Sequence, residues 1–178
     1  MQRIDHIRLM ARYNSWMNER LYTAASTLSD EALSAERGAF FGSILGTLNH
    51  LLVADRIWLG RYSAHPANFR SLQAIVGQEA PTHLDQPMGA DIRELAALRK
   101  QLDSCIEALA AEMGEEQLDQ PLSYRNMKGA AAQKHFFALL MHLFNHQTHH
   151  RGQATTLLTQ AGVDVGVTDL LALIPDEL

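Results

Sequence analysis

Hydrophobic side chains recur every three or four positions along most of this chain, which is the period of an amphipathic α-helix. Four long segments carry the pattern. It predicts long helices over residues 4–27, 43–62, 91–113 and 131–161, and a short helix over 29–36. The segments 63–89, 115–130 and 163–178 lack the pattern and are expected to be irregular, with the last packing along the other elements.

Residues that favour helix ends support these boundaries. Ser43 and Asp91 stand at the start of two predicted helices, where a side-chain oxygen can accept free backbone N–H groups. Gly114 and Gly162 follow the last apolar positions of two others, and glycine readily adopts the left-handed conformation that ends a helix. We expect an all-α four-helix bundle with a short extra helix and irregular connections, as a single domain over residues 1–178.

The charge and the apolar content of the chain indicate which kinds of partner it can bind. The formal net charge is −5 and the basic residues are scattered, so we expect no nucleic-acid partner. No apolar run approaches the roughly 20 residues that span a bilayer, so we expect no membrane partner. The single cysteine, Cys105, excludes an intrachain disulfide, and the start of the chain lacks the apolar core of a signal peptide. These features favour a cytoplasmic protein.

Histidines concentrate in the last predicted helix, which contains five of the nine in the chain. At about 100° per residue, His150 lies about 30° from the apolar direction of this helix and His146 about 70°. These two imidazoles point most nearly inward and lie one turn apart, so both could reach one metal ion. Hydrogen-bonded core histidines would have the same spacing, and the pair alone leaves both interpretations open. His142 and His149 lie beyond about 100° and are expected at the surface or behind the ligands.

Two known arrangements of metal-binding helices are not supported. A zincin helix needs a glutamate directly after its first histidine as general base, and this position is Gln147. A di-iron bundle needs Glu-x-x-His on two helices, and the sequence contains none. A third ligand is therefore expected to come as a histidine or carboxylate from another helix.

The second long helix contains two polar residues in unusual surroundings. His50 lies in the middle of a segment that is apolar on most of its circumference, and it is the best candidate for the third ligand. A lone hydrogen-bonded histidine would look the same, and the helical wheel does not decide. Asp55 lies among leucines, where an unpaired carboxylate would be costly, so it should pair with an arginine or orient a ligand.

Three segments together resemble the DinB/YfiT-like family. They are a stretch of the first helix that looks like the opening of the family's longer bacterial members, the histidine-bearing part of the second helix, and the His-x-x-x-His-Arg-Gly-Gln element of the last: residues 12–18, 47–59 and 146–153. The resemblance follows nearly the whole chain in order and spacing. It implies a four-helix bundle in which His50, His146 and His150 surround one divalent metal ion with an open coordination position, and it implies frequent dimerisation.

The resemblance also implies classes of activity. Family members of known activity include thiol-dependent transferases and isomerases that act with low-molecular-weight thiols such as mycothiol or bacillithiol, and many members have no assigned activity. Three neutral imidazoles leave an ion its full charge and an open position, which can lower the pKa of a bound thiol or water. We therefore expect a metal-dependent transferase or hydrolase with a small-molecule substrate, forming a homodimer. The alternative is a non-catalytic metal-binding or stress-response interaction protein, whose site would have no pocket beside it.

The ligands do not identify the ion, because imidazole binds several transition metals well. We expect zinc or nickel, with iron or manganese as alternatives. No general base stands out from the sequence. The candidates to support the ligands or to contact substrate are Asp55, Asn14, Asn49 and His149. Helical spacing places three aromatic residues in the core rather than in a pocket: Tyr13, Trp16 and Trp58.

Overall fold

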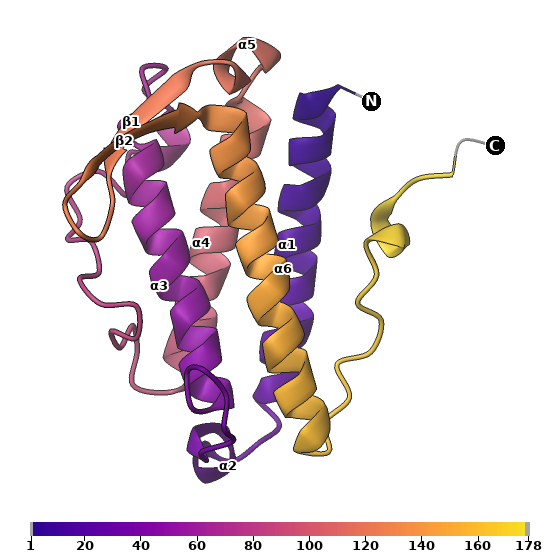
Figure 1. Cartoon of the computed structure of the whole chain (residues 1–178). Coiled ribbons are helices and arrows are strands. Elements are labelled where there is room, and N and C mark those ends of the chain that lie inside the picture. The colour runs from indigo at the N-terminus through magenta and orange to yellow at the C-terminus, as the bar shows by residue number, and fades with distance from the viewer. Residues whose placement is uncertain (1, 177–178) are drawn as a thin grey trace.

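Four long helices form the body of the computed structural model, which describes residues 2–176 (Figure 1). They are α1 (Arg3–Ala25), α3 (Ile44–Tyr62), α4 (Ile92–Glu112) and α6 (Phe136–Gln160). Helices α1 and α6 run in one direction, and α3 and α4 run in the other. The predicted bundle is confirmed, and the single domain expected over 1–178 includes three positions, 1, 177 and 178, that lie outside the described residues.

The predicted helix starts agree with the capping contacts. The Ser43 hydroxyl accepts the Gly46 N–H at 3.0 Å, and the Asp91 carboxylate accepts the N–H groups of Arg93 and Glu94. Short elements decorate the ends of the bundle: α2 (Asp30–Ser34), α5 (Glu115–Leu118) and the 3-10 turns η1 (Arg70–Leu72) and η2 (Leu170–Leu173).

The segment before α6 was predicted wrongly. Residues expected to be irregular or to begin the last helix form an antiparallel hairpin of β1 (Pro121–Arg125) and β2 (Ala131–His135). The Asn126 side chain accepts two N–H groups of the turn, and Gly129 has a φ of +77°, which glycine adopts easily. This turn and the burial of Leu122 outweigh the helix preference of the alanines near 131, so α6 begins at Phe136.

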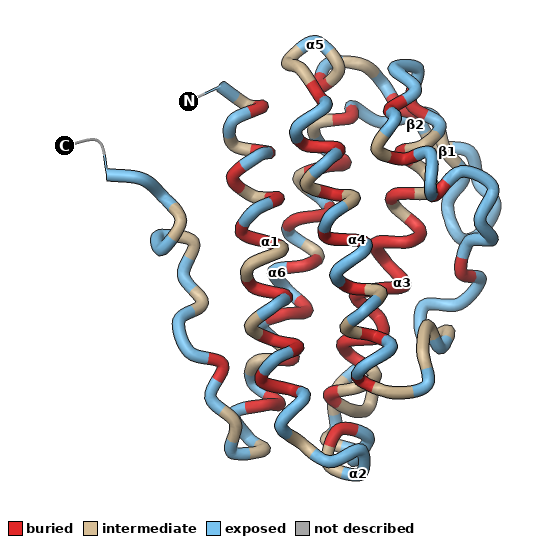
Figure 2. The backbone as a smooth tube through the Cα atoms, turned by 180° about the vertical axis from the view of Figure 1, so that it is seen from behind, coloured by how far each residue is buried: buried red, intermediate tan, exposed pale blue. Residues whose placement is uncertain are grey.

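Buried residues recur along all four long helices (Figure 2). Helix α3 is buried around most of its circumference, as its apolar sequence predicted. The tail after α6 runs beside the bundle, where Val165 is buried and the Tyr13 hydroxyl donates to the Thr168 carbonyl at 2.7 Å. None of the helices in the described part of the chain is long and apolar enough to cross a membrane.

The connection from α3 to α4 covers residues 63–91 and returns along the length of the bundle (Figure 1). It has little regular structure besides η1. Its last part passes beside the start of α3, where its backbone contacts the side chains of Asn49 and His50. The crossover therefore contributes to the surroundings of a candidate site residue.

Candidate metal centre

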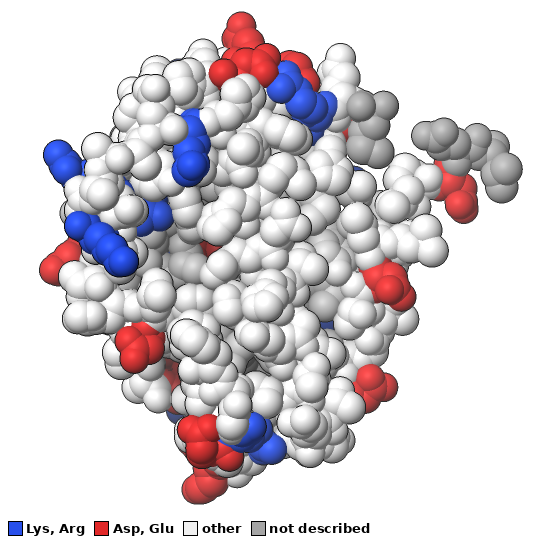
Figure 3. Space-filling model, viewed as in Figure 1, with Lys and Arg blue, Asp and Glu red and all other residues white. Residues whose placement is uncertain are grey.

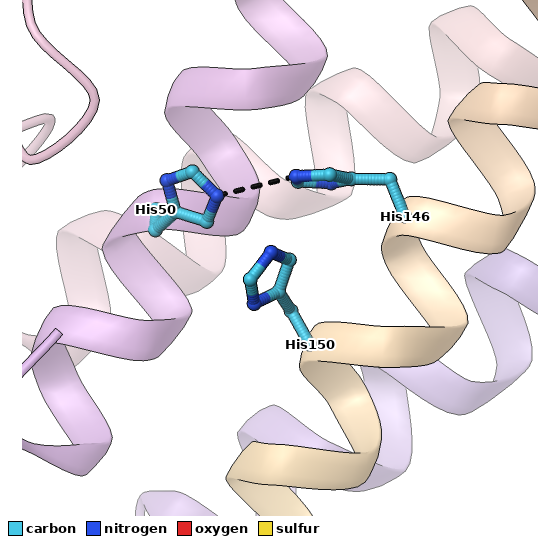
Figure 4. Close-up of side chains that lie close together, drawn as sticks. All are labelled: His50, His146 and His150. Carbon is cyan, nitrogen blue, oxygen red and sulfur yellow. Dashed lines mark hydrogen bonds between the residues drawn. The ribbon is translucent and has the colours of Figure 1, made fainter. Parts of the chain in front are cut away.

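Three imidazole side chains converge between α3 and α6 (Figure 4). His50 comes from α3, and His146 and His150 come from successive turns of α6. One ring nitrogen from each residue lies within 4.8 Å of the others, and the Nε2 atoms of His50 and His146 are 3.3 Å apart. The three residues that the sequence singled out therefore form a cluster that could hold a metal ion.

Hydrogen bonds orient two of these rings. The Nδ1–H of His50 donates to the Leu84 carbonyl at 2.8 Å, and the Nδ1–H of His150 donates to Oε1 of Gln153 at 2.7 Å. A carbonyl oxygen only accepts, so in both rings the proton lies on Nδ1 and the Nε2 lone pair is free. This arrangement, with the outer nitrogen fixed by a carbonyl, is typical of histidine ligands.

The spacing of the facing nitrogens fits a bound cation. The Nε2 lone pair of His50 points at Nε2 of His146, 3.3 Å away, so a proton or a cation must lie between them. Tetrahedral zinc, with bonds of about 2.0–2.1 Å to nitrogen, separates two ligand nitrogens by about 3.4 Å. The Nδ1 atom of His146 is buried and has no hydrogen-bond partner within residues 2–176. No protein acceptor therefore dictates the tautomer of His146, and its Nε2 is available as a ligand.

Burial keeps the three imidazoles neutral. It lowers the pKa of His50 and His150, and it lowers the pKa of His146 to about 3, with the neighbouring imidazoles adding to the effect. A charged imidazolium would be poorly solvated here and would be repelled by the other two. Neutral imidazole is the form that binds metal, so near neutral pH the cluster needs to release no proton on binding.

Asn49 anchors the crossover segment that orients His50. Its amide donates to the Gln86 carbonyl at 2.9 Å, and its Oδ1 accepts the N–H of Met88 at 2.8 Å. These two bonds hold the stretch that begins with Leu84, whose carbonyl binds His50. Asn49 thus lies behind a candidate ligand, where the sequence analysis expected a supporting residue.

A buried layer of charged and amide side chains connects the four long helices. Arg99 of α4 pairs with Asp55 of α3 at 2.7 Å and with Asp103 at 3.0 Å. Asp55 also accepts the Gln147 amide of α6 at 2.5 Å, and Asp103 accepts the Asn14 amide of α1 at 2.9 Å. The prediction that Asp55 pairs with an arginine is confirmed. Because Gln147 follows His146, the layer fixes the positions of α3 and α6 at the histidine cluster.

Asn14 and His149, the other candidates to support the ligands, do not anchor the crossover as Asn49 does. Asn14 accepts a hydrogen bond from Arg151 in the buried layer and is not among the residues that line the cavity beside the histidines. His149 is exposed, and its ring stands edge-on to the His150 ring at 4.8 Å. Asn14 therefore supports the bundle, whereas His149 covers the outer side of a candidate ligand.

A cavity of about 310 Å³ opens beside the histidines. Its wall is mainly apolar, with Phe41 stacked on the His50 ring at a centroid distance of 3.8 Å. Trp58, two turns after His50 on α3, is half-buried; it packs against the core, as expected, and it also lines this cavity. That spacing was readable from the sequence once His50 was taken as a ligand.

His142 and Arg61 are further cavity residues that the sequence analysis did not assign to the site. His142 was expected at the surface or behind the ligands, and it is partly exposed. Its ring nevertheless packs on Trp58 at 4.8 Å and lies 5.9 Å from the His146 ring, at the cavity mouth. Desolvation and the charge of Arg61 lower its pKa. Of the other aromatic residues, Tyr13 is buried, and Trp16 lies under the Arg20 guanidinium outside this cavity.

Comparison with known proteins places the chain among relatives over its whole length. The sequence model of the DinB family matches residues 1–177. Protein DinB of Bacillus subtilis (strain 168) is 28% identical over 157 residues, which cover 88% of this chain and 87% of that protein. A crystal structure of a DinB-like protein from Bacillus cereus has a TM-score of 0.59 and 25% identity, covering 85% of this chain and 89% of the other.

Proposed function

Because this chain belongs to the DinB family, we propose that it is a metal-dependent enzyme in which His50, His146 and His150 hold one divalent ion. The nucleophile is a small thiol or water, and the reaction is transfer of the thiol to an electrophile, or hydrolysis. The observation that carries the proposal is the 3.3 Å separation of the His50 and His146 Nε2 atoms, in rings whose free nitrogens face one another. This is about the separation that a tetrahedral ion requires.

The residues around the cluster have separate parts in this proposal. When bound, the ion supplies positive charge and an open position, which lower the pKa of a thiol or water. Leu84 and Gln153 keep the His50 and His150 rings in the ligating tautomer. Phe41, stacked on His50, excludes water from one side of the cluster. His142, at the cavity mouth with a lowered pKa, is neutral near pH 7 and can accept a proton from an incoming nucleophile.

The cavity favours an enzyme over the non-catalytic alternative. A protein that only binds metal, or that uses the site to stabilise an interaction surface, needs no space beside the ligands. Here about 310 Å³ opens next to the three imidazoles, at the lower end of the volumes of small-molecule sites. We propose zinc or nickel as the ion, with iron or manganese as alternatives, a low-molecular-weight thiol as one substrate, and a homodimer as the assembly.

The test starts from protein purified without a histidine tag. Its metal would be identified by mass spectrometry, and the protein loaded with that metal would be assayed for thiol transfer to electrophiles and for hydrolysis of small esters and amides. We expect turnover in one of the two assays that is lost in His146→Ala and abolished by a chelator. A fully loaded parent protein without turnover in either assay would favour the non-catalytic alternative.

A further inference from the structure

Arg61 brings a permanent positive charge to the wall of the histidine cavity. It is half-buried on α3, and its guanidinium lies 4.5 Å from the Trp58 ring and 5.0 Å from the Tyr124 ring. Within residues 2–176 it makes no side-chain hydrogen bond and no ion pair. The aromatic rings stabilise the cation, but they leave its N–H donors without an acceptor.

The three arginines that are buried within residues 2–176 bond to protein acceptors. Arg99 pairs with two carboxylates, Arg151 donates to Asn14, and Arg56 donates to the Glu79 carbonyl at 3.4 Å. Arg61 is only half-buried, so its unbonded donors remain open to an anion at the cavity wall. An arginine that lines a cavity with free donors is therefore suited to bind an anion that enters the cavity.

The position of Arg61 sets the distance from the histidines. It lies eleven residues after His50 on the same side of α3, with Trp58 between them, which corresponds to about 16 Å along the helix axis. Side chains of a helix lean toward its N-terminus, so the guanidinium leans back toward His50, to a separation on the order of 10 Å. The apolar wall spans the space between the two ends.

The cavity continues beyond Arg61. A neighbouring depression of about 530 Å³ shares Ile57, Arg61 and Met127 with it and adds Arg125 from β1. Figure 3 shows a group of basic side chains at the upper left of this face, where Figure 1 places α3 and the hairpin. The surroundings of Arg61 therefore attract anions and leave room for a ligand longer than the first cavity.

We infer that the substrate carries a carboxylate that binds Arg61, separated by an apolar segment of several bonds from the group that reaches the histidines. The planar guanidinium matches a carboxylate with two parallel hydrogen bonds. Trp58 and the other apolar wall residues contact the intervening segment. The inference rests on the proposed function in one respect, which is that the reacting group of the substrate lies at His50, His146 and His150.

The test compares two probes that differ at one end. ω-Mercaptohexanoate carries a carboxylate, and ω-mercaptohexanol carries a neutral hydroxyl in its place. Binding to the full-length protein loaded with cobalt(II) would be measured by calorimetry at neutral pH and low salt, and the thiolate-to-cobalt absorption band would be recorded separately. The variants are Arg61→Gln, Arg61→Lys and the matched control Arg20→Gln, because Arg20 also lies over a tryptophan but outside the cavity.

We expect the carboxylate probe to bind the parent roughly tenfold or more tightly than the alcohol, as charged hydrogen bonds do. The preference should disappear in Arg61→Gln with the affinity for the alcohol unchanged, return in part in Arg61→Lys, and persist in Arg20→Gln. Equal affinities in the parent, no binding of either probe, or a preference that survives Arg61→Gln would overturn the inference. A missing absorption band with both probes would contradict thiol activation by the metal. The ratio of the two affinities measured by calorimetry would still decide whether Arg61 binds the carboxylate.

Discussion

Removing the Asn49 side chain should weaken metal binding without removing a ligand. In Asn49→Ala the crossover loses two of its side-chain bonds to α3, one to the Gln86 carbonyl and one from the Met88 N–H. The Leu84 carbonyl that fixes the His50 ring then lies on a segment that is held less firmly. His50 would sample other ring orientations and the other tautomer, so its Nε2 would face the cluster for only part of the time.

The expected size of the effect follows from the bonds involved. Two hydrogen bonds with a net contribution of about 0.5–1.5 kcal/mol each give a loss of about 1–3 kcal/mol in unfolding free energy of the metal-free protein. Loss of a group that orients a ligand lowers metal affinity about 10- to 100-fold. Both quantities are measurable, the first by urea unfolding after chelation and the second by competition with a chromophoric chelator.

A control on the same segment separates orientation from general loosening. Among residues 2–176 the Gln86 side chain accepts hydrogen bonds from Thr82 alone, whereas Asn49 binds the Gln86 backbone. Gln86→Ala should therefore leave metal affinity within about threefold of the parent, because the tie to α3 remains. Unchanged affinity in Asn49→Ala, or an equal loss in both variants, would refute the role given to Asn49.

Three further predictions concern stability. Arg99→Leu leaves Asp55 and Asp103 buried without their cation and should cost about 3–5 kcal/mol in urea unfolding. Arg3→Ala at the exposed Glu115 and Asp119 pairs should cost far less, because solvent screens these pairs, and similar losses would contradict this contrast. Burial raises the pKa of Asp103 to about 6 from about 3.9 in unfolded chains, so the folded protein keeps a proton that the unfolded chain releases. The stability of the parent relative to Asp103→Asn should then fall as the pH rises from about 4 to 6, and a rise would show that the Arg99 charge outweighs burial. Gly129→Ala should lower the free energy of unfolding by about 1–2 kcal/mol. The positive φ alone causes this loss, since a Cβ at Gly129 meets no atom within 4 Å. An unchanged free energy of unfolding would show that residue 129 does not adopt a positive φ in the hairpin turn.

The bundle and the inward direction of two of the candidate ligands could be predicted because they follow from helical periodicity. His146 and His150 lie on the inward side of α6, and this follows from angles on a single helix. His50 could not be chosen in the same way, because α3 is apolar and buried around most of its circumference. Its place in an apolar helix made it the best candidate, the resemblance to a family then favoured it over a lone core histidine, and the structure places its ring against His146.

The remaining features depend on contacts between distant parts of the chain. The sequence indicated that Asp55 needs a cation, but the partner, Arg99, lies 44 positions away on another helix. The hairpin depends on a turn at Asn126 and Gly129, and the local preference of Ala131 and Ala132 opposes it. The anchoring of His50 by the crossover depends on backbone carbonyls, which carry no sequence pattern.

The central claim is that three histidines hold one metal ion, and metal content tests it most directly. The ratio of metal to chain would be measured for untagged parent protein and for His50→Ala, His146→Ala and His150→Ala, with His149→Ala as the control on the same helix. We predict about one ion per chain in the parent and in His149→Ala, since three imidazoles and an open position form one site, and loss of that ion in each of the three ligand variants. A parent that takes up no metal after reconstitution with zinc, nickel, manganese or iron would contradict the account, as would ligand variants that retain the metal of the parent.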